Sequence, residues 1–245
     1  FRGYLQGDAM RIVLLRLLLV VACAGQLSLL RTVTAIRAAD KPSPRTIQVP
    51  ADHARIQQAI DAAGDGDTVL VAPGTYRESL QLKGKQITLA SRFLVTSDKK
   101  DVERTVLDGK ASGNEKKSRG NTPITVAEDV GPKTRIIGFT IANGDDGISC
   151  TAKIQIVHNR FINNGDAIDY ERGGGLCRNN VFENNRDDAV DLDGATEAII
   201  EDNVIRNCGD DGIEIRLHKY RGKLLNIVIR RNQIIDSGED GIQII

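Results

Sequence analysis

The chain has 245 residues and a mass of 26.6 kDa, which allows one elongated domain or one domain with a leader. Hydrophobic residues make up 40% and charged residues 27%, which excludes a membrane bundle and a disordered chain. Aromatic residues reach only 4%, with no tryptophan, which disfavours a site built from stacked rings for neutral sugars or single-stranded nucleic acid.

The formal net charge of zero hides an asymmetry along the chain. The first 39 residues carry five arginines and one acid, so 28 basic and 32 acidic residues remain for the rest. A mildly acidic protein has no general electrostatic reason to bind nucleic acid, so we expect no nucleic-acid partner.

The N-terminal segment has the pattern of a secretory signal. Met10 and Arg11 precede an apolar run from Ile12 to Cys23, so we expect residues 1–39 to be a leader and the protein to be secreted, periplasmic or bound to the cell surface. Val20-Val21-Ala22-Cys23 resembles a bacterial lipobox, which would make Cys23 a lipid anchor. An uncleaved membrane anchor over 12–30 is the alternative, although Arg16 interrupts it; we expect no membrane span in the mature chain.

Residues 40–245 are predicted to form one domain. Its first part indicates a strand at Ile47-Gln48-Val49, an amphipathic helix over Arg55–Ala63, and strands within Thr68–Tyr76. Alternating apolar residues near 80–82, 87–89, 124–126 and 136–141 predict further strands. The charged stretches 92–104 and 109–122 are expected to be loops.

From residue 139 onward a repeat of about 20 to 23 residues recurs, which is typical of a solenoid. Each unit has an apolar residue preceded by a small residue and, two places earlier, by Asp. The apolar column is Ile148, Ile168, Val190, Ile213 and Ile242. The Asp column is Asp146, Asp166, Asp188, Asp211 and Asp240.

A second pair of columns lies upstream in each unit. An Asn column is followed two residues later by an apolar column: Asn159, Asn180, Asn203 and Asn232, then Phe161, Phe182, Ile205 and Ile234. Short strands of period two cannot bury a face alone, so each unit must stack on the next. Identical amides on successive turns can then hydrogen-bond along the stack. The predicted fold is all-β, a parallel β-helix.

With these repeats the chain resembles the right-handed parallel β-helix proteins of the pectin-lyase-like superfamily. The resemblance covers roughly residues 46–245 and implies that the helix at 55–63 caps the N-terminal end of the solenoid core. The sequence stops at Ile245 within a strand pattern and without a polar cap, so we expect the C-terminus to be truncated. Cys150, Cys177 and Cys208 lack metal-ligand spacing, and Cys150 and Cys177 fall at expected core positions.

One outer face of the predicted solenoid is acidic. Residues flanking the apolar column should point outward, which places Asp169, Asp191 and Glu214 in one column and Asp193 and Arg216 beside it. Carboxylates on adjacent coils, about 4.8 Å apart, have the spacing of a Ca²⁺ site and raise each other's pKa. The longest insertion, 216–223, is basic and should project beside this face.

The sequence supports several roles for this face, and the leading one is a pectate or alginate lyase-like enzyme acting on an acidic polysaccharide. In that role Ca²⁺ or Arg neutralises the uronate carboxylate while a basic side chain removes the C5 proton. The candidate residues fall into three sets. The candidate base and clamp are Arg216, His218 and Lys219; the substrate-binding residues are Asp169, Asp193, Tyr220 and Arg221; the metal ligands are Asp188, Asp191, Asp211 and Glu214.

Other functions remain open from the sequence. An epimerase would use the same proton abstraction. A glycoside hydrolase is favoured by Asn164-Gly165-Asp166 and Asp187-Asp188, which are similar to the polygalacturonase pattern. Asp210-Asp211-Gly212 and Gln243-Ile244-Ile245 depart from that family's later motifs and put this activity in doubt. A non-catalytic β-helix for carbohydrate binding, adhesion or periplasmic maturation is the main alternative, since Asp-Gly also suits a plain turn.

Overall fold

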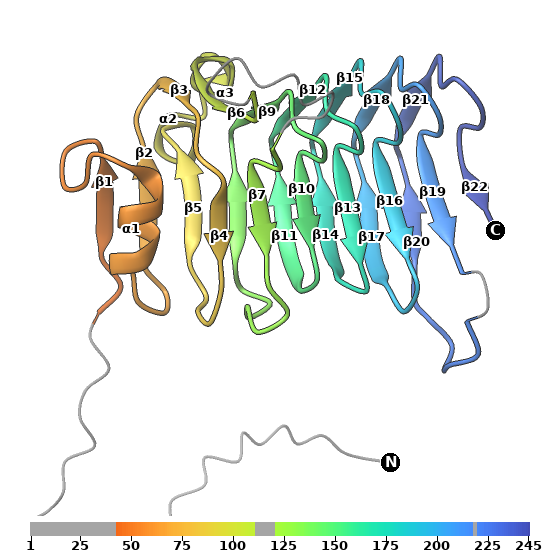
Figure 1. Ribbon diagram of the computed structural model, residues 1–245, viewed down its shortest axis with the longest axis horizontal. Helices are drawn as coiled ribbons and strands as arrows, with labels where there is room; N and C mark the ends of the chain where they lie inside the picture. Colours follow the sequence, from red (N-terminus) through yellow and green to blue (C-terminus); the bar gives the residue numbers. More distant parts are fainter. Residues whose placement is uncertain (1–42, 111–120, 218–219) are drawn as a thin grey trace, which may run out of the picture. The chain divides into compact units, whose positions relative to one another are not determined.

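The structure, a computed structural model, describes residues 43–110, 121–217 and 220–245. The predicted leader, with Cys23, lies outside the described residues, as do His218 and Lys219. The described residues belong to one compact unit. Within it the chain winds repeatedly through three parallel sheets (Figure 1).

From β2 onward, each coil contributes one strand to each sheet in turn. The first sheet consists of β1 (Thr46–Val49), β2 (Thr68–Val71), β5 (Thr88–Ser91), β8 (Arg135–Ile137), β11 (Lys153–Val157), β14 (Gly174–Arg178), β17 (Glu197–Glu201) and β20 (Val228–Arg230). The second consists of β3 (Gly74–Tyr76), β6 (Thr105–Asp108), β9 (Thr140–Ala142), β12 (Arg160–Ile162), β15 (Val181–Glu183), β18 (Val204–Arg206) and β21 (Gln233–Ile235). The third consists of β4 (Leu80–Leu82), β7 (Ile124–Val126), β10 (Ile148–Cys150), β13 (Ile168–Glu171), β16 (Val190–Asp193), β19 (Ile213–Arg216) and β22 (Gln243–Ile244).

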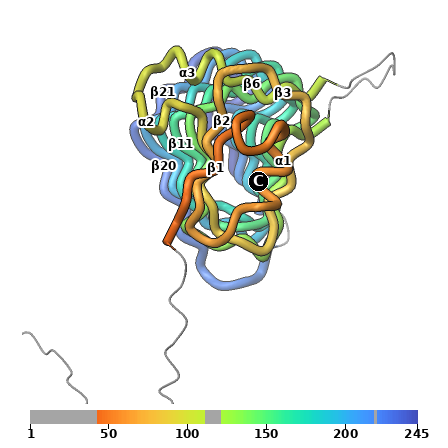
Figure 2. Tube along the Cα trace, turned by 90° about the vertical axis from the view of Figure 1, so that its left-hand side faces the viewer, coloured from red at the N-terminus to blue at the C-terminus, as the bar shows by residue number. Residues whose placement is uncertain are grey.

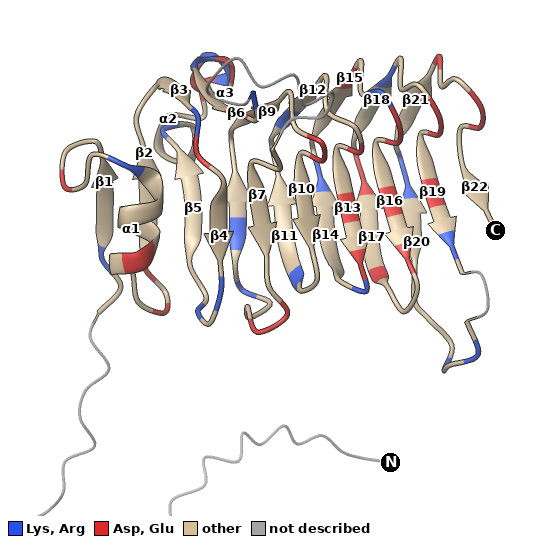
Figure 3. Ribbon diagram, in the orientation of Figure 1, with Lys and Arg blue, Asp and Glu red and all other residues tan. Residues whose placement is uncertain are grey.

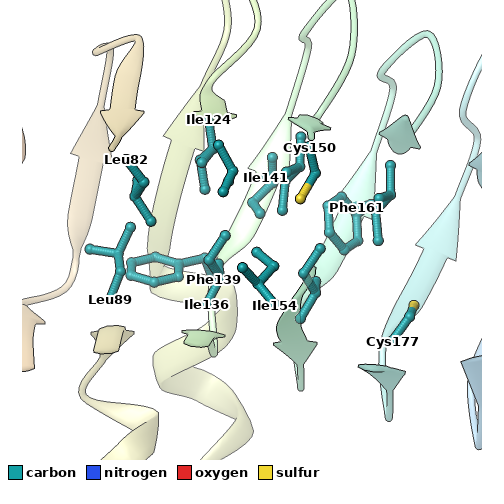
Figure 4. Packing of buried hydrophobic residues seen from close by; sticks show 14 of the residues in the cluster. Leu82, Leu89, Ile124, Ile136, Phe139, Ile141, Cys150, Ile154, Phe161 and Cys177 are labelled. Atoms are coloured by element: carbon teal, nitrogen blue, oxygen red, sulfur yellow. The ribbon is translucent and has the colours of Figure 1, made fainter. Parts of the chain in front are cut away.

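The predicted apolar column stacks in register. Ile148 pairs with Ile168, Ile168 with Val190, and Val190 with Ile213, and all four are fully buried. The second column does the same, and the Phe161 and Phe182 rings are parallel, with centroids 4.9 Å apart. Figure 4 shows such side chains from successive coils meeting in one interior, and Figure 2 views the solenoid from its N-terminal end. The prediction of a parallel β-helix is confirmed.

The corners explain the abundance of Asn in this sequence. The first residue after many strands of the first and second sheets has a left-handed backbone conformation, which Gly and Asn adopt at least cost. These residues are Gly138, His158, Asn179, Asp202 and Arg231 at one corner, and Asn143, Asn163, Asn184, Asn207 and Asp236 at the next. Each coil therefore turns at the same two places.

At several corners the next residue is an Asn, and its side-chain amide links neighbouring coils. The Asn180 side chain donates to Ile156 O at 2.9 Å, and its Oδ1 accepts from the backbone N of Asn159 at 2.9 Å. Asn203 repeats this arrangement one coil later, so the predicted Asn column is a hydrogen-bonded ladder. The sequence reasoning missed a second ladder at the other corner, in which Asn185 accepts from the backbone N of Asn164 at 3.1 Å.

The N-terminal helix is present as α1 (Ile56–Ala62), and it contacts β1, β2 and β4. Ile56, Ala59 and Ile60 on one face of α1 are buried and join the core. The carboxylate of Glu78 accepts from the first backbone N–H groups of the helix, at 3.0 Å from Ile56 and 3.2 Å from Gln57. The contacts of α1 with β1, β2 and β4 agree with its predicted place over the N-terminal end of the solenoid core.

The prediction of a loop over 92–104 is wrong. This stretch contains α2 (Phe93–Thr96) and α3 (Lys99–Arg104). Asp98 caps α3 by accepting from the backbone N of Lys100 at 3.0 Å. Most of the other stretch expected to be a loop, 109–122, lies outside the described residues. The three described cysteines are buried and free, and burial raises the pKa of Cys177 to about 12.

Candidate functional site

The Asp residues before the third-sheet strands form a backbone ladder. Oδ1 of Asp166 accepts from the backbone N of Asp188 at 3.0 Å, and Oδ1 of Asp188 accepts from that of Asp211 at 2.7 Å. Asp211 serves Asp240 in the same way at 2.7 Å. One oxygen of each carboxylate is therefore used for the turn, and the other oxygen is available for a different partner.

The outward acids of the third sheet line up on neighbouring coils, where Asp169 pairs with Asp191 and Asp191 with Glu214. Figure 3 shows these acidic positions side by side on β13, β16 and β19. Although they point away from the apolar core, Asp191 and Glu214 are only 4% and 5% exposed. This burial distinguishes them from the acids of an ordinary solvated face.

Two of these outward carboxylates converge with one from the preceding turn. One oxygen from each of Asp188, Asp191 and Glu214 lies within 4.8 Å of the other two. Two oxygens that bind one Ca²⁺ at about 2.3–2.6 Å are at most about 5 Å apart, so the three can share one ion. We call Asp188, Asp191 and Glu214 the carboxylate cluster.

Arg216, at the end of β19, lies against this cluster. Its Nη1 is 3.2 Å from Oδ2 of Asp191 and 3.3 Å from Oδ1 of Asp193, and its Nη2 pairs with Glu214. Burial lowers the pKa of Arg216, but the charges of Asp191, Glu214 and Asp193 outweigh this and raise it overall. The guanidinium is held in its charged form, which fits a charge clamp and disfavours a proton-abstracting base.

The acids of this face are more easily protonated than ordinary carboxyls. Burial raises the pKa of Asp191 to about 8 against the lowering effect of the Arg216 charge. Repulsion from neighbouring acids adds to the rise. Burial and the charge of neighbouring acids raise the pKa of Asp169 to about 7. The pKa of Asp188 is also raised, first by burial and then by Asp166 and Glu214, although the backbone N–H of Asp211 opposes the rise. Close carboxylates that water cannot reach resist carrying charge together.

One oxygen of the cluster lacks a hydrogen-bond donor. Oδ1 of Asp191 is buried and has no hydrogen-bond partner among the described residues, whereas Oδ2 of the same carboxylate has Arg216. Oδ1 of Asp169 is buried without a partner in the same way. A buried ionised oxygen with no donor is costly, and a bound cation would remove that cost.

A second group of acids shares Asp188. One oxygen from each of Asp166, Asp187 and Asp188 lies within 4.8 Å of the others, and Asp187 is exposed. Burial and nearby acids raise the pKa of Asp166 to about 7, against the lowering effect of the Asp188 backbone N–H. Asp166 and Asp187 were not among the predicted metal ligands. Asp166 stands in the Asp column one coil before Asp188, and this position was the signal that could have included them.

The structure brings together some of the predicted site residues and not others. Asp188, Asp191, Glu214, Asp193 and Arg216 are adjacent, and Asp169 lies one coil away. Asp211 is absent from both acid groups found among the described residues, and its Oδ1 is used by Asp240. It therefore serves the turn ladder.

The insertion after β19 is only partly described. Tyr220 Oη donates to Lys223 O at 3.0 Å, and Arg221 donates to Tyr220 O at 2.9 Å, so both side chains form hydrogen bonds within the loop. His218 and Lys219 lie outside the described residues. Their roles and those of Tyr220 and Arg221 stay predictions.

Comparison with known families agrees with this architecture. Residues 116–245 match the family model described as the right-handed β-helix region. The chain therefore belongs to the right-handed β-helix family, the class of protein that the three stacked sheets also define. Searches of curated proteins and of solved structures return no match.

The described residues also bear on membrane association. No helix within the described ranges is both long and apolar enough to cross a membrane.

Proposed function

We propose that the third sheet binds an acidic polysaccharide with the help of Ca²⁺ and acts on it as a lyase-like enzyme. The observation that carries this proposal is the carboxylate cluster, in which three buried acids from two coils converge and Asp191 keeps one oxygen without a donor. When bound, Ca²⁺ would supply positive charge that neutralises a uronate carboxylate and acidifies the neighbouring C–H bond.

The chain's own residues would hold the ion and position the polymer. Asp188, Asp191 and Glu214 supply the oxygens, and Arg216 places a fixed positive charge beside them. Asp169 and Asp193 flank the cluster on the same face, and each coil adds one strand about 4.8 Å further along the solenoid. A polymer lying along that direction would meet the cluster and its flanking residues in sequence.

The proton-abstracting group is assigned to the basic insertion. Arg216 is held protonated by three acids, so His218 or Lys219 is the proposed base. Dense charge together with few aromatic residues favours an anionic over a neutral polymer. Export, proposed from the apolar run at 12–23, would place the enzyme with such polymers.

The test uses the full chain with polygalacturonate and with alginate, in Ca²⁺ and in a chelator. We expect ultraviolet-absorbing unsaturated products in Ca²⁺ only, and none from Glu214→Gln. Retention on the polymer without any product would instead support the non-catalytic binding protein. Absence of both retention and product would contradict the proposal.

A glycoside hydrolase is the second candidate, and the group of Asp166, Asp187 and Asp188 favours it. Burial and neighbouring acids raise the pKa of Asp166 to about 7, which suits a general acid near neutral pH. New reducing ends without ultraviolet-absorbing products, lost in Asp166→Asn, would support hydrolysis over elimination.

A further inference from the structure

A cavity lies under an insertion at the corner between the first and second sheets. Each of the other six such corners in the described coils uses two residues, for example His158 and Asn159 between β11 and β12. Between β5 and β6 the chain uses residues 92–104 and forms α2 and α3 (Figure 1). The turn itself does not require this extra length, so the insertion calls for another explanation.

The insertion is anchored firmly to the solenoid. The Thr140 hydroxyl donates to Val102 O at 2.9 Å, and Val102 is buried. Gly138 has φ +77°, and a Cβ there would lie 2.7 Å from Cβ of Phe93 and 2.7 Å from Oγ of Ser91. Because a glycine directly follows β8, α2 can approach the backbone closely here.

The anchored insertion nevertheless leaves space beside it. A cavity of about 270 Å³ lies between the two helices and the corners that join β11 to β12 and β14 to β15. Phe93 and Val102 line it from the insertion, and His158 and Val181 line it from the solenoid. The Phe93 and His158 rings are in contact, with centroids 5.1 Å apart and planes at 42°. Phe93 is one of only nine Phe and Tyr residues in the chain.

The cavity has charged side chains of both signs. Lys99, Arg160 and Glu103 all line it. Arg160 is paired with Glu183 at 2.7 Å, whereas Lys99 is exposed and has no ion pair among the described residues. Burial lowers the pKa of His158, and the nearby Arg178 and Lys99 lower it further, which agrees with a positive local potential.

We propose that this cavity binds a small aromatic carboxylate. The ring of the ligand packs against Phe93, Val102 and Val181, and its carboxylate pairs with the ammonium group of Lys99. The apolar lining suits the ring of such a ligand, and Lys99 is the lining cation without an ion pair among the described residues, so it is available to the carboxylate; Glu103 is the one acid in the lining. This site lies on the first and second sheets, so it is independent of the function proposed for the third.

The experiment is calorimetric titration of the full chain with 4-hydroxycinnamate, 4-ethylphenol and acetate. We expect binding of 4-hydroxycinnamate in about the millimolar range or tighter, and much weaker binding of the neutral phenol and of acetate. Lys99→Gln should weaken 4-hydroxycinnamate binding about five- to tenfold, since it removes a charged hydrogen-bond donor. Lys100→Gln, on the same helix and not at the cavity, is the matched control and should bind as the parent does.

Three results would overturn the proposal. They are no detectable binding of 4-hydroxycinnamate to the parent protein, equal binding of 4-ethylphenol, and equal loss in Lys99→Gln and Lys100→Gln. Phe93→Ala separates the apolar contribution, and we expect it to weaken the aromatic acid while leaving acetate unchanged. Because α2 is a short helix on the outside of the solenoid, the melting temperature of each variant checks that the fold is intact.

Discussion

Asp191 combines three properties that seldom occur together in a surface strand. It points away from the apolar core, it is 4% exposed, and one of its oxygens lacks a donor among the described residues. Arg216 compensates only the other oxygen. A carboxylate in this situation is destabilising unless it is protonated or bound to a cation.

Replacement of Asp191 by Asn should therefore have opposite effects with and without metal. In a chelator at about pH 8 we expect Asp191→Asn to melt at a higher temperature than the parent, because a neutral amide removes a buried charge. In Ca²⁺ the variant should lose the stabilisation shown by the parent, with affinity weakened at least about tenfold. Asp193→Asn, two residues along β16, is the control and should keep the Ca²⁺ response.

The raised pKa values also give the metal-free protein a defined response to pH. Burial, followed by neighbouring charges, raises the pKa of Asp169 to about 7 and that of Asp191 to about 8, from an ordinary 3.8. Between pH 3.8 and these raised pKa values the folded state holds more protons than the unfolded state, so its stability falls as pH rises.

We expect the free energy of unfolding in a chelator to decrease from about pH 4 to about pH 8 through these groups, and this contribution to level off above that range. Denaturant titrations at several pH values measure it. Comparison of the parent with Asp191→Asn isolates the share of that residue. A parent that gains stability relative to the variant as pH rises would show that the carboxylate is not destabilised by burial.

At the scale of elements, the two Asn ladders hydrogen-bond neighbouring coils at the corners, as the sheets do along the strands. Asn180 serves the backbone of Ile156 and Asn159, and it is 1% exposed. Without its amide, a carbonyl and an N–H group would be buried without partners, at about 1–3 kcal/mol each.

Asn180→Ala should therefore lower the free energy of unfolding by about 3 kcal/mol. The neighbouring Asn179 is exposed and has φ +56°, a conformation that glycine adopts freely. Asn179→Gly is the matched control, and we expect a change of less than about 0.5 kcal/mol. Equal losses in both variants would mean that the ladder adds nothing beyond the turn conformation. Chemical denaturation measures both values.

Most of these elements could be predicted because a repeat reveals its own register. Aligning Ile148, Ile168, Val190, Ile213 and Ile242 was enough to place every third-sheet strand after residue 139. The helices at 93–104 were missed because they belong to an insertion that occurs once and so has no repeat to align with. Asp98, which caps α3, was the available local signal.

The candidate site could be predicted only in part, for a related reason. Spacing put Asp191 and Glu214 on one outward face, but it could not show that they are buried, because that depends on how Arg216 folds back over them. Asp211 shares the column of Asp188 and looked equivalent in sequence. Asp211 lies on the same coil as Glu214, yet the acid groups found among the described residues do not include it, which its place in the shared column could not show.

At the scale of the whole molecule, each coil is stabilised by the coils on either side. The strands β11, β14 and β17 pair on both edges, whereas β20, β21 and β22 pair on one edge among the described residues. The side chains of Ile242 and Ile244 near the open edge are 46% and 69% exposed. Stability should therefore vary along the solenoid.

Hydrogen exchange would measure this variation directly. We expect the slowest exchange in β11, β14 and β17 and clearly faster exchange in β20, β21 and β22 of this chain, because the latter pair on one edge only among the described residues. Uniform protection from α1 to β22 would indicate that the solenoid unfolds as a single unit and that nearest-neighbour contacts do not set local stability.

The claim that three buried acids on the third sheet hold a divalent cation is tested most directly by diffraction. Crystals of the full chain soaked with Tb³⁺, a Ca²⁺ substitute that scatters anomalously, should give an anomalous peak among Asp188, Asp191 and Glu214, and Asp191→Asn crystals should lack it. Binding elsewhere, for example only at Asp187, or an empty cluster in the presence of the ion would contradict the account.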